Sequence, residues 1–118
     1  MEPAEESFEK LEVWRRSHAL SIEIYRLLAD CRDRGFKDQI TRSANSVSDN
    51  IAEGAERTGK PEFKQFLGYA KGSAGEARSQ VLRAIALNYI SPETGQRLTQ
   101  ELREISRMIH GLIKSPDR

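Results

Sequence analysis

Apolar residues recur at intervals of three and four along almost the whole of the 118-residue chain. This spacing places them on one side of an α-helix, where they can face a common core. It is most regular near the end of the chain, at Leu98, Leu102, Ile105, Ile109 and Leu112. No stretch alternates apolar and polar residues as a half-buried strand would. The pattern therefore predicts an all-α protein.

Four helical segments are predicted, separated by residues that interrupt the spacing. They span about residues 8–30, 36–57, 61–88 and 92–114. Thr58 is the expected cap of the third helix, because Pro61 is tolerated only in a first helical turn. Ser91-Pro92-Glu93 indicates a cap, a proline at the first helical position and an acid near the positive helix end. Four helices with short connections predict an antiparallel up-down four-helix bundle.

The composition indicates one helical domain in a reducing compartment. Residues 1–7 are expected to form a disordered acidic tail, and residues 8–114 the bundle domain. A single cysteine, Cys31, excludes an internal disulfide. No apolar run approaches the ~20 residues of a membrane span, and the acidic start differs from a signal peptide. A cytoplasmic protein without membrane contact is therefore expected.

Motifs for catalysis, metals and cofactors are not predicted. The run from Gly54 to Lys60 matches a phosphate-binding loop up to its last position, where Pro61 replaces the residue that would hold magnesium. That run joins two helices, whereas a working loop joins a strand to a helix. His18 and His110, together with one cysteine, are too few for a zinc site. We therefore expect no enzyme, no cofactor and no metal.

A polar stripe follows the second predicted helix beside its apolar side. Its members, in steps of three or four, are Gln39, Arg42, Ser46, Asn50, Glu53 and Arg57. Glu76 on the third helix is expected to face this stripe, with Ser73 beside it. One interpretation is a buried or interfacial hydrogen-bond network that fixes helix register and subunit partner. The other is a ligand or catalytic pocket with Glu53 and Glu76 as paired carboxylates.

The third predicted helix carries a cluster of small residues and a line of basic ones. The small residues are Gly68, Gly72, Ser73, Ala74 and Gly75. They indicate close approach of a neighbouring helix or, alternatively, a binding cleft. The basic residues Lys64, Lys71 and Arg78 recur every seven positions, and Lys60 and Arg57 extend the line. Because the net charge is only +1, nucleic-acid binding would need such a local patch. A solvated helix face is the alternative.

The polar stripe belongs to a run that resembles a known family. The run from Gln39 to Gly54, followed by Arg57, resembles the signature of the four-helix-bundle family of 23S rRNA intervening-sequence proteins. Further matching pieces are Phe8, Leu11 to Trp14, Ile24-Tyr25, Glu62-Phe63, Phe66-Leu67 and Ala70 to Ser73 with Glu76. The chain departs from the pattern at Thr41, where many members have an arginine, and at Ser48, where they have proline.

The resemblance implies an assembly and a connection with RNA. It implies a homopentamer of up-down bundles, encoded in bacteria and in some cases by inserts within large-subunit rRNA genes. A related branch comprises accessory proteins of diversity-generating retroelements, which bind a reverse transcriptase and nucleic acid. We therefore predict a non-enzymatic oligomeric scaffold that binds RNA or a nucleic-acid-processing protein. The alternative is a protein–protein interaction module without a nucleic-acid role.

Overall fold

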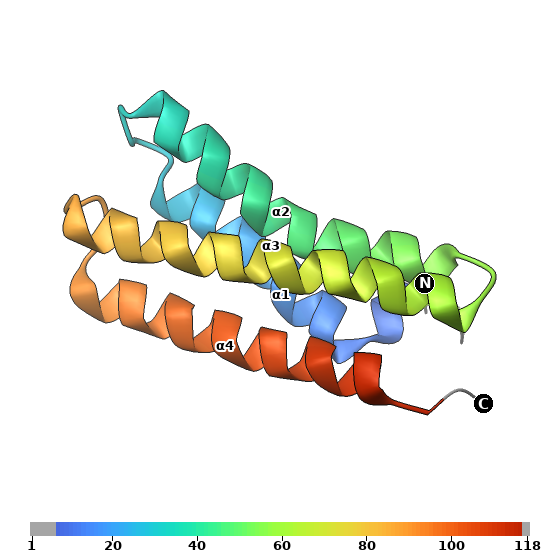
Figure 1. Cartoon of the computed structure of the whole chain (residues 1–118). Helices are drawn as coiled ribbons and strands as arrows, with labels where there is room; N and C mark the ends of the chain where they lie inside the picture. The colour runs from blue at the N-terminus through green and yellow to red at the C-terminus, as the bar shows by residue number, and fades with distance from the viewer. Residues whose placement is uncertain (1–6, 117–118) are drawn as a thin grey trace.

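The chain folds as four α-helices and one short 3₁₀ turn in the computed structural model, which describes residues 7–116. The elements are η1 (Phe8–Lys10), α1 (Glu12–Leu27), α2 (Arg34–Glu56), α3 (Lys60–Ala86) and α4 (Pro92–Lys114). Successive helices run antiparallel, and the described chain begins and ends at the same end of the bundle (Figure 1). The predicted all-α, antiparallel up-down four-helix bundle is confirmed.

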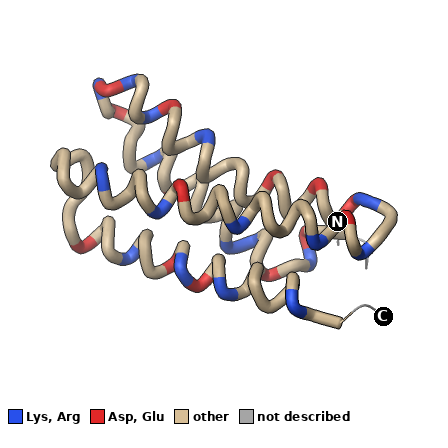
Figure 2. The backbone as a smooth tube through the Cα atoms, viewed as in Figure 1, with Lys and Arg blue, Asp and Glu red and all other residues tan. Residues whose placement is uncertain are grey.

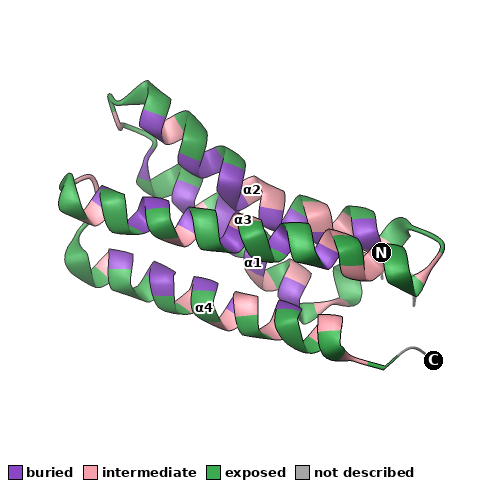
Figure 3. Ribbon diagram, in the orientation of Figure 1, coloured by how far each residue is buried: buried purple, intermediate pink, exposed green. Residues whose placement is uncertain are grey.

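The inner sides of the helices form one apolar core (Figure 3). Each helix contributes residues that are almost completely buried, including Ile24, Ile40, Leu67 and Ile105. These residues belong to the three- and four-residue spacing of the sequence, so the periodicity decides which side of each helix turns inward. Among the described residues, no helix is long and apolar enough to cross a membrane.

Two predicted helix starts are wrong. The first segment does not run unbroken from Phe8, because Leu11 is extended and separates η1 from α1. Arg15 stabilises this break by donating to the carbonyls of Glu9 and Lys10 at 2.9 and 2.8 Å. Gly59, not Thr58, is the N-cap of α3, because its extended backbone leads directly into Lys60. The expected tail at residues 1–7 lies, apart from Ser7, outside the described residues.

The cap of α4 is as predicted, and a second cap links two loops. Ser91 accepts from the amide of Thr94 at 3.2 Å, and Pro92 follows it. Asp33 caps α2 by accepting from the amide of Phe36 at 3.1 Å. Its second oxygen accepts from the hydroxyl of Tyr89 at 2.7 Å, which joins the α1–α2 loop to the α3–α4 loop. The Tyr89 hydroxyl is the main reason that the pKa of Asp33 lies below its ordinary value.

The glycines of α3 do not mark close helix contact within the chain. A Cβ built on Gly68, Gly72 or Gly75 would meet no atom within 4 Å, so that part of the small-residue prediction is wrong. These positions lie on the outer side of α3, whereas Ala74 of the same cluster is buried. Close approach occurs instead at Gly54, where a Cβ would lie 2.7 Å from the Phe66 Cβ.

Candidate functional site

The basic line of α3 lies on the side of the helix next to α4. Lys64 Nζ donates to the carbonyl of Ser115, just beyond α4, at 2.8 Å. Lys71 and Arg78 follow Lys64 at seven-residue steps and therefore share this side. Lys60 and Lys71 are exposed and Arg78 is half-buried. These three side chains make no hydrogen bond or ion pair with any described residue.

Unlike Lys60, Lys71 and Arg78, Arg57 is already paired with another side chain of the protein. Its guanidinium forms an ion pair with Glu53 at 2.7 Å and lies 4.9 Å from the centre of the Phe66 ring. The negative charge of Glu53 offsets its positive charge, and the ring contact fixes its position. The expected extension of the basic line through Arg57 is therefore neutralised locally.

Helix α4 carries a second row of cations on its exposed side, away from the core. Arg103, Arg107 and Lys114 are exposed and recur in steps of four and seven. Figure 2 shows lysines and arginines along both helices. On α3, Glu76 lines a groove next to α2, and Glu62 shares its side of the helix. On α4, Glu104 pairs with Arg16 of α1 and also interacts electrostatically with Arg107. We define the basic surface by its residues on these two helices: Lys60, Lys64, Lys71, Arg78, Arg103, Arg107 and Lys114.

A second candidate site is a polar groove of about 520 Å³ between α2 and α3. It is lined by Gln39, Arg42, Ser43, Ser46, Glu76, Ser79, Gln80 and Arg83. The structure thus brings three of the predicted stripe residues, Gln39, Arg42 and Ser46, together with Glu76 of α3. Glu76 faces α2 as expected, but Glu53 does not line this groove. The two carboxylates are therefore not combined in one pocket.

The remaining stripe residues are accessible in the single chain. Asn50 is half-buried and donates to the carbonyl of Ser46 at 2.8 Å, within α2. Ser73 is also half-buried, and Glu53 is exposed beside Arg57. One chain therefore does not bury the stripe as a network, and the interfacial form of that interpretation stays a prediction. The sequence reasoning also missed Gln80, a polar residue at a core-facing position one turn after Ala77 and before Ala84.

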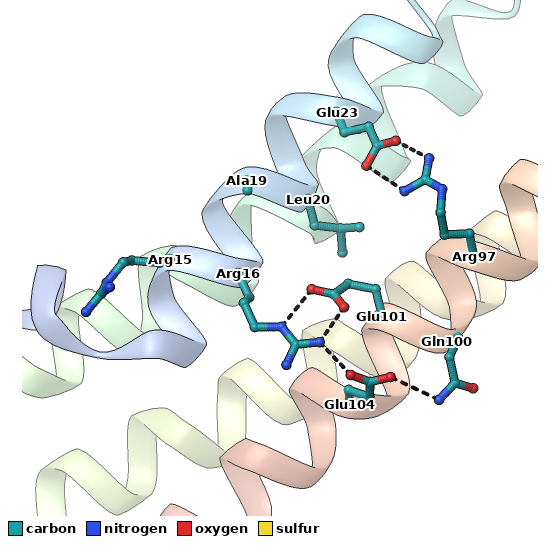
Figure 4. A pocket seen from close by; sticks show the side chains of 9 residues that line it. All are labelled: Arg15, Arg16, Ala19, Leu20, Glu23, Arg97, Gln100, Glu101 and Glu104. Carbon is teal, nitrogen blue, oxygen red and sulfur yellow. Dashed lines mark hydrogen bonds and ion pairs between the residues drawn. The ribbon is translucent and has the colours of Figure 1, made fainter.

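A third pocket, of about 540 Å³, lies between α1 and α4, which have fewer mutual contacts than the other neighbouring pairs (Figure 4). Arg16 forms ion pairs there with Glu101 and, at 2.6 Å, with Glu104. Arg97 pairs with Glu23 across the same seam. Apart from Arg15, which binds backbone carbonyls, the charges of this pocket bind one another across the two helices, which indicates a structural contact.

Removing the central cation of this seam is expected to weaken the bundle. Arg16→Met should lower the free energy of unfolding at neutral pH by about 1 kcal/mol, because a partly exposed ion pair contributes at most modestly. Urea denaturation followed by circular dichroism measures the change. Arg26→Met is the matched control, because Arg26 is exposed on α1 and its side chain has no partner in the part of the chain that the structure describes. Equal losses of unfolding free energy in both variants would contradict the stabilising role assigned to the ion pairs of Arg16.

Lowering the pH is expected to reduce the difference in the free energy of unfolding between the wild-type protein and Arg16→Met. Arg16 lowers the pKa of Glu104 below its ordinary value of 4.5, mainly through the hydrogen bond between the two side chains. A carboxyl group with a lowered folded-state pKa stabilises the fold above its ordinary pKa, and this contribution disappears as pH falls through the lowered value. The two proteins should therefore differ less near pH 3 than at pH 7. A constant difference across this range would contradict the ion-pair account.

Among the described residues, no group of three His, Cys, Asp or Glu side chains is placed to hold a metal ion. His18 stacks on Trp14 with ring centres 4.7 Å apart.

Two comparisons place the chain among known proteins. A model of the family described as 23S rRNA-intervening sequence protein matches residues 9–111. A crystal structure at 1.70 Å, of a protein with unknown function from the S23 ribosomal protein family of Bacteroides thetaiotaomicron VPI-5482, matches with a TM-score of 0.78. The identity is 24%, over 87% of this chain and 99% of that chain, so this likeness concerns the fold. No curated protein matches.

Proposed function

The chain belongs to the 23S rRNA-intervening sequence protein family, and from this premise we propose that it is a non-enzymatic, cytoplasmic, oligomeric scaffold that binds RNA. The basic surface is the proposed RNA contact. A nucleic-acid-processing protein bound to the same RNA is a further proposed partner. Asn50 and Glu53 of the polar stripe, which lie outside the groove between α2 and α3, and the outer side of α3 are the proposed contacts between copies.

The observation that carries this proposal is the local separation of charge. Seven lysines and arginines gather on α3 and α4, although the whole chain has a net charge of only +1. Successive cations of the α3 line lie about 10 Å apart along the helix, from a rise of 1.5 Å per residue. An extended row of cations can neutralise several phosphates and release their counterions, which is the main source of sequence-independent affinity.

The outer side of α3 supports self-association. Glycine within a helix costs roughly 1 kcal/mol relative to alanine, yet Gly68, Gly72 and Gly75 touch nothing within the chain. Tyr69 and Leu82 on the same helix are 50% and 53% exposed. A second copy is proposed to approach the bare backbone near Gly72 and to cover Tyr69. Gly68, Gly75 and Leu82 alternate in steps of three and four with the cations of the basic line and therefore lie beside it. We propose a homopentamer, in which five basic surfaces would strengthen RNA binding through multivalency.

The proposal is tested by recovering what the protein binds, before and after nuclease treatment. Tagged protein should retain RNA, and ribonuclease should release any co-purified protein that is held through that RNA. Native mass spectrometry of the same sample should give five times the 13.4 kDa chain mass. A defined protein partner that survives ribonuclease, with no RNA recovered, would instead support the alternative protein–protein interaction module. The low net charge and the exposed Tyr69 and Leu82 favour that second candidate.

A further inference from the structure

The groove between α2 and α3 holds charged groups that the proposed RNA contact does not use. It lies on the α2 side of α3, whereas the basic surface lies on the α4 side. Arg42 stands on one wall, and Arg83 and Glu76 stand on the other. None of these three side chains forms an ion pair or hydrogen bond with a described residue. The groove therefore offers two uncommitted cations and one uncommitted carboxylate.

Gln80 at the groove adds a polar group in a position where polar groups are rare. The residue is only 7% exposed and lines the groove. Its carboxamide oxygen accepts from the hydroxyl of Ser43, and its nitrogen has no hydrogen-bond partner among the described residues. Among the described residues, no fully buried side-chain nitrogen or oxygen lacks a partner, so this nitrogen retains some exposure to solvent. Because Gln80 lines the groove, its amide can supply a donor to a ligand bound there.

The combination of donors fits a phosphate group. Arginines on opposite walls can approach an anion from two directions, as a tetrahedral group requires, and their guanidinium forks match phosphate oxygens. The Gln80 amide and the hydroxyls of Ser46 and Ser79 supply neutral donors between them. The volume of about 520 Å³ is within the range of sites for small organic ligands.

Glu76 narrows the ligand class further. A carboxylate beside the site repels a bare anion, but it accepts hydrogen bonds from hydroxyl groups. We propose that the groove binds a phosphate ester that carries sugar hydroxyls, a ribose phosphate unit, with Arg42 and Arg83 on the phosphate and Glu76 on a hydroxyl. This inference does not rest on RNA binding by the basic surface, because it uses different residues on a different side of α3.

Isothermal titration calorimetry of the full-length protein with ribose 5-phosphate and with inorganic phosphate tests the site. Ribose 5-phosphate should bind more tightly than inorganic phosphate. Arg42→Gln and Arg83→Gln should each weaken its binding at least about tenfold, since each removes a charge-assisted hydrogen bond. Both residues are exposed, so the variants should fold. Arg26→Gln, outside the groove, should bind like wild type. Undetectable binding, or equal affinity in all variants, would overturn the proposal.

The Glu76→Gln variant tests whether the groove recognises a sugar hydroxyl in addition to the phosphate group. Loss of the negative charge should strengthen binding of inorganic phosphate and reduce the advantage of ribose 5-phosphate over it. Weaker binding of both ligands would contradict the role of Glu76 as hydroxyl acceptor.

The source of the ribose phosphate is determined by competition. A 5′-phosphorylated four-nucleotide RNA that displaces ribose 5-phosphate, with an affinity sensitive to Arg83→Gln, would identify an RNA end as the ligand. An RNA that leaves ribose 5-phosphate bound would identify a free sugar phosphate. Because Lys71 and Arg78 are intact in these variants, loss of binding here is distinguishable from failure of the basic surface.

Discussion

Gly54→Ala is expected to destabilise the bundle although alanine favours helix over glycine. The new Cβ would lie 2.7 Å from the Phe66 Cβ and 3.3 Å from the Phe63 carbonyl. Neither atom is the end of a flexible side chain, so α2 and α3 must move apart to relieve the overlap. Overpacking of this kind costs about 1–3 kcal/mol, and the helix propensity of alanine offsets at most about 1 kcal/mol. The free energy of unfolding should therefore fall by about 1–2 kcal/mol.

Gly111→Ala is the matched control, because a Cβ at that α4 position meets no atom within 4 Å. It should raise the free energy of unfolding by up to about 1 kcal/mol through helix propensity alone. Chemical denaturation of both variants measures the two changes, which are expected to have opposite signs. If Gly54→Ala stabilised the protein as much as Gly111→Ala, the close approach of α2 and α3 at Gly54 would be disproved.

The double charge reversal Lys71→Glu/Arg78→Glu is expected to reduce RNA affinity about a hundredfold near 0.1 M salt, from the loss of two phosphate contacts. The slope of log affinity against log salt should also become shallower by about 2, one for each lost contact. Lys71 is exposed and Arg78 half-buried, and neither has a partner among the described residues, so the fold should persist. Fluorescence anisotropy with labelled RNA measures both quantities.

The control reverses the same number of charges elsewhere on the molecule. Arg26→Glu/Arg32→Glu changes two exposed arginines near the α1–α2 connection and alters the net charge equally. It should reduce affinity much less, because long-range charge effects are screened within about 10 Å at 0.1 M salt. Equal losses of RNA affinity in the two double variants would indicate a general effect of net charge. They would contradict the assignment of the basic surface as the RNA contact.

Much of the fold was predictable because it depends on local periodicity. The inward positions of α4, such as Leu102 and Ile105, follow directly from steps of three and four. The Ser91-Pro92 start of α4 was predictable because its cap is made by neighbouring residues. The break at Leu11 was not, because it is stabilised by Arg15 reaching back to carbonyls of the preceding turn.

The site residues were harder to interpret because their roles depend on contacts between helices. The seven-residue steps correctly grouped Lys64, Lys71 and Arg78, but could not reveal that Lys64 donates to Ser115. Likewise, the spacing placed Arg57 in line without indicating that Glu53 and Phe66 hold it. Glycine composition alone does not distinguish the bare outer side of α3 from the tight contact at Gly54, because that depends on which helix lies opposite.

The most direct test of RNA binding by the basic surface is the salt dependence of affinity in the wild-type protein. Purified, nuclease-treated protein is titrated into structured and single-stranded RNA, and fluorescence anisotropy is followed across a salt series. The account predicts affinity for RNA that falls log-linearly and steeply with salt, as phosphate contacts release counterions. Absence of binding even at low salt, or an affinity independent of salt, would contradict it and direct attention to protein partners.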